Sequence, residues 1–389
     1  MRRRLAAGLL TAAVALPLLV GCSSDSLAPG TVDLACPTVP GGPVTLAVGA
    51  RANSPAPLLP PAIVDLMREA AKQNHAVSVI RVDGAPTVAF QGTFKSDAAN
   101  DVARSNELEA FITQTTTYIS SLKPKTAEAD VLAALSEAAR ITPTGGTVVL
   151  IDSGLQTTGQ LRFQDPGAFG ADPAEFVDYL RKRSLLPQLE NRAVVLIGLG
   201  NTAEPQAALD GSQRSRVTAI WQTVAQEAGA SCVQVIDTAA SRTSVQTDVP
   251  VTPVSLPTVP PFQACGETVL HEDTVGFLPD QAVFRDPATA RRTIQDLATV
   301  VMNGRQAITL IGTTATAGTS EASRKQLAQR RAEAVKSVLV ELGIAPDRIT
   351  TIGAGTEWPG RVNDIAPDGS LIPTAAAQNR AVVVQLTCS

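Results

Sequence analysis

Residues 243–266, TSVQTDVPVTPVSLPTVPPFQACG, divide the chain, because five prolines fall within them. Proline lacks a backbone N–H and fixes its φ angle, so this stretch favours an extended, semi-rigid conformation and cannot easily form an internal strand or helix. The sequence therefore predicts two folded modules, about residues 44–240 and 265–389, joined by a proline-rich linker over residues 241–264.

The N-terminus has the order of a secretory signal. Three arginines at positions 2–4 precede an apolar run over residues 5–20, and Gly21 and Cys22 follow. The run is short for a membrane span, which needs about 20 residues. Its end, LVGC, resembles a bacterial lipobox, which implies a signal peptide over residues 1–21 and lipidation (palmitate or a similar acyl chain) at Cys22.

An ordinary signal peptide or an uncleaved anchor is the alternative to the lipobox. Residues 22–43 are rich in Ser, Pro and Gly and are predicted to form a flexible tether. With a lipidated Cys22, the mature lipoprotein would lie on the extracytoplasmic side of a bacterial membrane, held by acyl chains at about 0.8 kcal/mol per buried CH₂.

Composition argues against nucleic acid as a partner. The formal net charge is −4, and it becomes −7 when the three leader arginines are subtracted from the chain. Nucleic-acid binding needs a basic surface, which this balance does not favour. Aromatic residues make up 3% of the chain and hydrophobic residues 44%, so the cores must be built from Val, Leu, Ile and Ala.

Five cysteines are present, and four remain if Cys22 is lipidated. An even number in an oxidising compartment suggests disulfides, for which three connectivities exist. Pairing within each module, Cys36 with Cys232 and Cys265 with Cys388, is the simplest choice. The alternative is that they are small buried thiols.

The N-terminal module alternates apolar strands with amphipathic helices, which predicts a doubly wound α/β sheet. The predicted strands cover residues 44–50, 75–82, 87–94, 146–154, 192–200 and 231–236. The predicted helices cover residues 62–73, 107–122, 126–141 and 216–230, with Thr126 as the N-cap of the third.

The order DVLAALSEAAR, GTVVLIDSGLQTTG, RAVVLIGLG and AIWQTVAQEAGA resembles a von Willebrand factor A-like domain. That family often holds a divalent metal with an Asp-x-Ser-x-Ser loop, a threonine and a later aspartate. Asp152 matches the last and Thr126 weakly matches the second, but the first loop has Arg51 and no aspartate. Because a hard cation needs several oxygen ligands, we expect no metal and no other cofactor. Asp152 is instead expected to accept hydrogen bonds from loop amides.

The C-terminal segment is predicted to be an α+β module with a β-α-β-α-β-β order. The predicted elements are a short strand and turn within residues 274–284, a helix over 290–303, a strand over 307–315, a helix over 321–342, and strands over 348–355 and 379–386. Gly343 is predicted to end the second helix as a C-cap.

Four segments of this module resemble the OmpA-like peptidoglycan-binding family over about residues 267–388. They are FLPDQAVF (277–284), ITLIGTTATAGT (308–319), the long run from Leu327 to Gly355, and AQNRAVVV (377–384). In that family a loop aspartate and a helix arginine clamp the diaminopimelate of a peptidoglycan stem peptide. The resemblance implies the same pairing of acid with ammonium and of guanidinium with carboxylate.

Carried over by position, the resemblance assigns the helix arginine to Arg331 and the closing-strand arginine to Arg380. Ala315 stands where the loop aspartate is expected, so the ammonium-binding half of the clamp is missing. An uncompensated ammonium would cost roughly 1–3 kcal/mol, which predicts weakened peptidoglycan binding.

Four further positions complete the implied site. Thr314 lies in the loop, Arg324 replaces the asparagine at the start of the helix, and Asp280 lies in the first segment. Glu321, close to the altered loop, is a candidate substitute for the missing acid.

No catalytic arrangement is evident, because neither histidine, His75 or His271, has a nucleophile in its sequence context. The chain is therefore not expected to be an enzyme. The sequence favours a lipid-anchored cell-envelope protein whose OmpA-like module contacts peptidoglycan and whose N-terminal module binds an unknown envelope protein. The alternatives are an envelope scaffold for protein–protein contacts without peptidoglycan binding and, less favoured, a periplasmic solute receptor.

Overall fold

The computed structural model describes residues 34–36, 40–238, 243–259, 261–317 and 320–388. The expected signal peptide, the lipidation site at Cys22 and most of the tether lie outside these residues. Within the described ranges, no helix has both the length and the apolar character needed to cross a membrane. The two modules belong to one compact unit.

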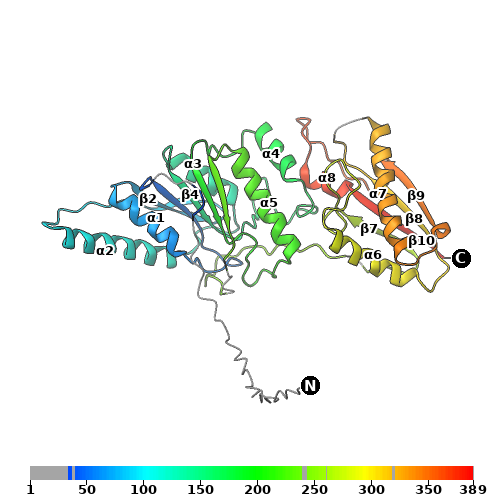
Figure 1. The fold of residues 1–389 in the computed structure, drawn as a ribbon, viewed down its shortest axis with the longest axis horizontal. Coiled ribbons are helices and arrows are strands. Elements are labelled where there is room, and N and C mark those ends of the chain that lie inside the picture. Colours follow the sequence, from blue (N-terminus) through cyan, green and yellow to red (C-terminus); the bar gives the residue numbers. More distant parts are fainter. Residues whose placement is uncertain (1–33, 37–39, 239–242, 260, 318–319, 389) are drawn as a thin grey trace, which may run out of the picture. The chain divides into compact units, whose positions relative to one another are not determined.

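A six-stranded sheet forms the centre of the N-terminal module (Figure 1), in the order β3-β2-β1-β4-β5-β6. Its strands are β1 (Val44–Gly49), β2 (Ala76–Val82), β3 (Thr87–Thr93), β4 (Thr147–Ile151), β5 (Ala193–Ile197) and β6 (Cys232–Ile236). All neighbours are parallel except β2 and β3. Every residue of β1, β4 and β5 is buried, as their continuous apolar sequences predict for strands covered on both faces.

Helices cover both faces of this sheet. They are α1 (Pro61–Lys72), α2 (Asp101–Ser120), α3 (Val131–Ile141), α4 (Pro173–Lys182) and α5 (Gly211–Glu227). Apolar residues of α1 and α2 form one core with one face of the sheet, and those of α3, α4 and α5 form a second core on the other. The sequence analysis did not predict α4, whose short amphipathic pattern lies between long loops.

The predicted N-cap of α3 was wrong. The helix begins at Val131, and the side chain of Asp130 accepts a hydrogen bond from the amide of Ala133 at 2.9 Å. Thr126 lies in the preceding loop, where its hydroxyl oxygen accepts from the amide of Ala85 at 2.9 Å. Asp130 is therefore the cap that satisfies an otherwise unpaired amide of the first turn.

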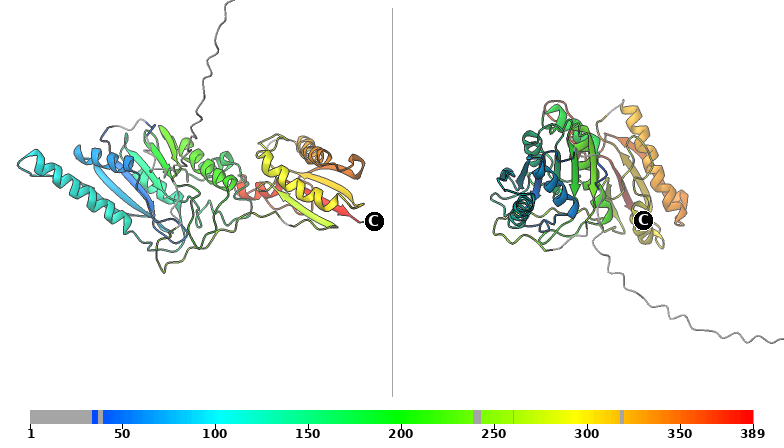
Figure 2. Two further views of the ribbon diagram at one scale, coloured as in Figure 1. Left: turned by 60° about the horizontal axis from the view of Figure 1, so that its bottom comes forward. Right: turned by 60° about the vertical axis from the view of Figure 1, so that its left-hand side comes forward.

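The C-terminal module is a four-stranded sheet in the order β7-β10-β8-β9, with α6 and α7 packed against it (Figure 2). Its strands are β7 (Gly266–His271), β8 (Ala307–Thr313), β9 (Ile349–Gly355) and β10 (Ala381–Thr387). Its helices are α6 (Pro287–Val301), α7 (Glu321–Glu341), the short 3-10 helix η1 (Pro346–Arg348) and α8 (Pro373–Asn379). Gly343, with φ 93°, follows the end of α7 as predicted.

The first strand of this module was placed wrongly from the sequence. It is β7, a partly exposed strand that pairs with β10, whereas residues 274–284 contribute only an isolated bridge between Phe277 and Phe284. Because β7 begins with Gly266 and Glu267, its sequence does not show the apolar alternation that predicts a strand. The helix α8 was also not predicted, since its seven residues are too few to show a helical repeat.

Two disulfides join the pairs that the sequence analysis favoured. Cys36 is bonded to Cys232 and Cys265 to Cys388, with Cα–Cα distances of 5.7 and 5.6 Å. The first joins the segment before β1 to the start of β6. The second joins the residue before β7 to the residue after β10, and so closes one end of this antiparallel pair.

The linker is extended and lies along the N-terminal module. The amide of Glu128 donates to the carbonyl of Pro250 at 3.2 Å, and the amide of Val254 donates to the side chain of Gln206 at 2.6 Å. Val254 is buried in the N-terminal core. The prolines thus disfavour competing secondary structure, and the amides of Thr252 and Val254 find partners on the module.

The modules also contact each other directly, with α8 beside α4. The side chain of Gln378 donates to the carbonyl of Pro166 at 2.9 Å. Arg183, just after α4, donates to the hydroxyl of Ser370 at 2.8 Å and pairs with Asp368 at 3.1 Å. These contacts hold the segments on either side of α4 against the C-terminal module.

Candidate functional site: a cleft lined by both modules

A cavity of about 400 Å³, here called the cleft, is bounded by α7, the loop after β8 and the first turn of α4. Four carboxylates and four guanidiniums line it: Asp172, Glu175, Glu272, Asp280, Arg324, Arg330, Arg331 and Arg380. The resemblance-derived positions Arg331, Arg380, Thr314, Arg324 and Asp280 all lie on its wall. The fold therefore brings together residues that are up to about one hundred positions apart within the C-terminal module.

Arg331 lines the cleft and is 3% exposed. It is on the buried face of α7, beside Ala328 and Ala332. Its Nε donates to the carbonyl oxygen of Gln281 at 3.0 Å, and its guanidinium lies 5.1 Å from the ring centre of Phe277. Among the described residues no carboxylate forms an ion pair with it, and burial lowers the pKa of Arg331 to about 10.

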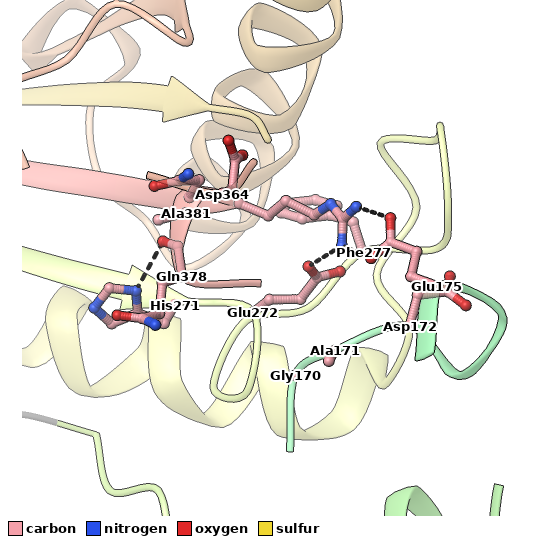
Figure 3. A network of polar contacts seen from close by, with 12 residues as sticks. Gly170, Ala171, Asp172, Glu175, His271, Glu272, Phe277, Asp364, Gln378 and Ala381 are labelled. Atoms are coloured by element: carbon pink, nitrogen blue, oxygen red, sulfur yellow. Dashed lines mark hydrogen bonds and ion pairs between the residues drawn. The ribbon is translucent and has the colours of Figure 1, made fainter. Parts of the chain in front are cut away.

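Arg380, by contrast, is held by carboxylates of the chain itself. Both carboxylate oxygens of Glu175 accept from its guanidinium, and Glu272 lies 3.5 Å away. Figure 3 shows Glu175 and Glu272 directed into this network from the two modules. Burial tends to lower the pKa of Arg380, but Glu272 and Glu175 raise it above its usual range.

Glu321 is the candidate substitute for the missing acid. Its carboxylate accepts from the hydroxyl of Thr356 at 2.7 Å and pairs with Arg324 at 2.9 Å. These contacts direct it to the end of β9, and it is not part of the cleft wall. In the structure Glu321 is thus engaged by its own neighbours and does not line the cleft, and its role as a substitute acid stays a prediction.

The loop after β8 presents a methyl group and a hydroxyl to the cleft. Ala315, at the position where the resemblance expects an aspartate, is 3% exposed and lines the wall. The amide of Thr314 donates to the carbonyl of Gly355 at 2.9 Å, but its hydroxyl is buried without a hydrogen-bond partner. Buried hydroxyls are normally hydrogen-bonded, so this oxygen marks a position at which a ligand atom would be favoured.

Sequence reasoning missed three of the four acids of the cleft wall, Asp172, Glu175 and Glu272. Asp172 and Glu175 belong to α4 of the N-terminal module, and Glu272 follows β7. The signal for α4 is present in the sequence as Asp-Pro-Ala-Glu, which has a capping residue, proline at the first helical position and an acid in the first turn. Nothing in the sequence indicates that this turn faces the other module.

A second candidate site, at the carboxyl edge of the N-terminal sheet, is filled by an ion pair. Arg51 donates to both oxygens of Asp152, and neither side chain is exposed to solvent. Asp152 also accepts from the amide of Gly154 at 2.7 Å, a loop amide as predicted. Thr126 lies elsewhere, against Ala85. In the described ranges no three His, Cys, Asp or Glu side chains are grouped in a way that could hold a metal.

Comparison with known proteins identifies the C-terminal module. Residues 277–368 match the model of the OmpA family. No curated protein matches the chain.

Similar solved structures cover about a third of this chain. The periplasmic domain of Helicobacter pylori MotB is 21% identical, with 32% of this chain and 78% of that chain covered and a TM-score of 0.26. The peptidoglycan-associated lipoprotein from Burkholderia pseudomallei is 22% identical, with 31% and 89% covered and a TM-score of 0.25. The cell wall anchor of the T6SS from Pseudomonas aeruginosa is 17% identical, with 32% and 81% covered and a TM-score of 0.26. On the family match, the C-terminal module of this chain is an OmpA-family domain.

Proposed function

We propose that this chain is a cell-envelope protein whose OmpA-family domain contacts peptidoglycan through the cleft around Arg331. The observation that carries the proposal is a buried guanidinium, with no carboxylate partner among the described residues, that lines a cavity of about 400 Å³. A buried charge without a counter-ion is unfavourable, and a ligand carboxylate would supply that counter-ion through charge-assisted hydrogen bonds.

The family match supports peptidoglycan as the source of that carboxylate. The cleft is within the size range of pockets for small ligands, and a stem-peptide side chain ending in a carboxylate fits its chemistry. Ala315 predicts that the loop itself contributes nothing to an ammonium group, so binding through the C-terminal module alone would be weak.

For the N-terminal module we propose a von Willebrand factor A-like fold that binds a protein partner without a metal ion. The strand order β3-β2-β1-β4-β5-β6, with helices on both faces, supports the fold. The buried pair of Arg51 and Asp152 supports the absence of metal, because the guanidinium fills the position that a cation would take. We further propose that lipidation of Cys22 anchors the chain to a membrane, and we propose no catalytic activity.

Sedimentation with insoluble, diaminopimelate-type peptidoglycan tests the proposal. The full chain should be retained at low salt, and Arg331→Ala should reduce retention by tens of fold, because it removes the buried cation that has no carboxylate partner among the described residues. Arg331→Lys keeps the charge without the planar fork and should give an intermediate result. Arg291→Ala changes an exposed arginine that pairs with Glu341 on the helices of the same domain, and should have no effect.

Two observations favour a second candidate, an envelope scaffold without peptidoglycan binding: the alanine at position 315 and the engagement of Arg380 by Glu175 and Glu272. The same experiment separates the two functions. If the wild-type chain is not retained at low salt, the scaffold is supported and the peptidoglycan proposal fails.

A further inference from the structure

The charged residues of the cleft divide into those with an ion-pair partner in the chain and those without one. Arg380 is paired with Glu175 and Glu272, and Arg324 is paired with Glu321. Four charged residues of the wall have no ion pair within the described part of the chain: Asp172, Asp280, Arg330 and Arg331. The cleft thus presents two cationic and two anionic groups that form no ion pair within the described residues, although Asp172 still interacts electrostatically with Arg216 and Arg380, and Asp280 with Arg331.

Two further observations indicate that a ligand occupies this space. The hydroxyl of Thr314, on a residue that is 4% exposed, lines the cleft and has no hydrogen-bond partner. Arg331 is 3% exposed and carries its charge against two carbonyls and an aromatic ring. Both groups have lost contact with water without gaining a full set of partners, which is unfavourable unless a ligand supplies them.

Asp172 is the unpaired acid that comes from the other module. It is the N-cap of α4, and one of its carboxylate oxygens accepts from the amide of Ala174 at 2.9 Å. The preceding carbonyls of Phe169 and Gly170 accept from Arg216 at 3.0 and 3.2 Å, which fixes the chain just before the cap.

The first turn of α4 and the segment just before it each contact the C-terminal module. Glu175 binds Arg380 through both carboxylate oxygens. Gly170 approaches the backbone of residues 272–273 so closely that a side chain there would come within 3.0 Å of the amide nitrogen of Asp273. Asp172 is therefore held at the cleft by contacts on both sides of it.

We infer that Asp172 supplies the acid that the loop after β8 lacks, so that the two modules together form one site for a zwitterionic ligand. The ammonium group would bind at Asp172 with Asp280, and the carboxylate would bind at Arg331. This inference rests on the proposed function, because it assumes that the cleft is the ligand site. It makes the N-terminal module a part of ligand recognition rather than a separate binding unit.

Titration calorimetry of the full chain with two probes tests the inference. The probes are meso-diaminopimelate and pimelate, which share a carbon chain and two carboxylates but differ in the ammonium groups. Asp172→Asn keeps a residue that caps helices well, so α4 should remain intact. We expect the variant to bind diaminopimelate roughly tenfold more weakly, since a charge-assisted contact is lost. Its affinity for pimelate should stay equal or increase, because a negative charge has been removed.

Asp178→Asn is the matched control, since Asp178 lies on the same helix with its side chain 68% exposed. It should leave both affinities unchanged. A loss of both probes in Asp172→Asn would mean that the residue only shapes the cleft, and unchanged affinities would mean that it does not face the ligand; either result overturns the inference.

Failure of the inference and failure of the proposed function give different results. Retention on peptidoglycan that depends on Arg331 but is insensitive to Asp172→Asn leaves the function standing and removes the two-module site. A wild-type chain that binds neither peptidoglycan nor diaminopimelate removes both.

Discussion

The guanidinium of Arg51 lies against both carboxylate oxygens of Asp152, and neither side chain is exposed to solvent. Ser153 accepts a further hydrogen bond from Arg51 at 3.2 Å, and the amide of Gly154 donates to Asp152. The pair occupies the carboxyl edge of the parallel strands, the place where doubly wound sheets commonly bind ligands. The guanidinium of Arg51 thus supplies the positive charge beside Asp152 at this edge.

Arg51→Met should strongly destabilise the N-terminal module. The substitution leaves the carboxylate of Asp152 buried without its counter-charge, which costs about 3–5 kcal/mol in the free energy of unfolding. Urea denaturation at neutral pH measures the loss. The double variant Arg51→Met with Asp152→Asn removes both charges and should recover part of it. Equal losses in the single and double variants would show that the charge of Asp152 is not the cause.

Asp83 should make the stability of the N-terminal module sensitive to acid. Burial alone would raise its pKa, but hydrogen bonds from the amide of Lys125, from Thr126, from the amide of Ala85 and from Arg81 outweigh this and hold the pKa below the usual 3.8. A carboxyl whose folded-state pKa is depressed adds stability above its unfolded pKa, and this stability is lost as pH falls through the folded value.

Asp83→Asn tests this linkage. Wild type should be more stable than the variant by roughly 1–3 kcal/mol at neutral pH, because hydrogen bonds to a charged acceptor are lost. The difference should stay constant down to about pH 4 and shrink on further acidification. Thermal unfolding of both proteins across this range measures it, and a difference that does not change with pH would contradict the prediction.

Gly312→Ala should disturb the cleft through packing alone. A Cβ at this position of β8 would overlap the backbone carbonyl of Ala328 in α7, so the helix that carries Arg331 would have to move. Overpacking of this kind costs about 1–3 kcal/mol, and we expect retention on peptidoglycan to fall with it. Gly211→Ala, at the start of α5 where no atom lies within 4 Å of the added methyl, is the control and should be neutral.

Loss of the Cys265–Cys388 disulfide should destabilise the OmpA-family domain. The bond closes a chain segment with a sequence separation of 123 residues, and its removal frees the unfolded chain. The double variant Cys265→Ser with Cys388→Ser should lose about 2–5 kcal/mol in denaturant unfolding. When a reducing agent opens the Cys265–Cys388 bond of the wild type, the wild type and the variant should have the same free energy of unfolding. If the variant is as stable as oxidised wild type, the bond does not support the domain.

The sequence determined those features whose signal is local. Apolar runs predicted β1, β4 and β5 because strands buried on both faces must be apolar throughout. The proline stretch predicted the division into modules, and the helical repeat with Gly343 predicted α7. Because the loop and α7 follow one another in sequence, the positions of Arg331 and Thr314 on one wall could be predicted from the family resemblance.

Only the tertiary structure decided which arginines of the cleft pair with carboxylates and which do not. Arg380, more than two hundred positions from Glu175, is neutralised by it, while Arg331 is left without a carboxylate. Asp172 reaches the cleft because α4 docks on the C-terminal module, and nothing near residue 172 in the sequence encodes that contact. Ion pairs depend on distance in space and on burial, which sequence spacing does not set, so the places of Asp172, Glu175 and Glu272 in the cleft wall could not be predicted from the sequence.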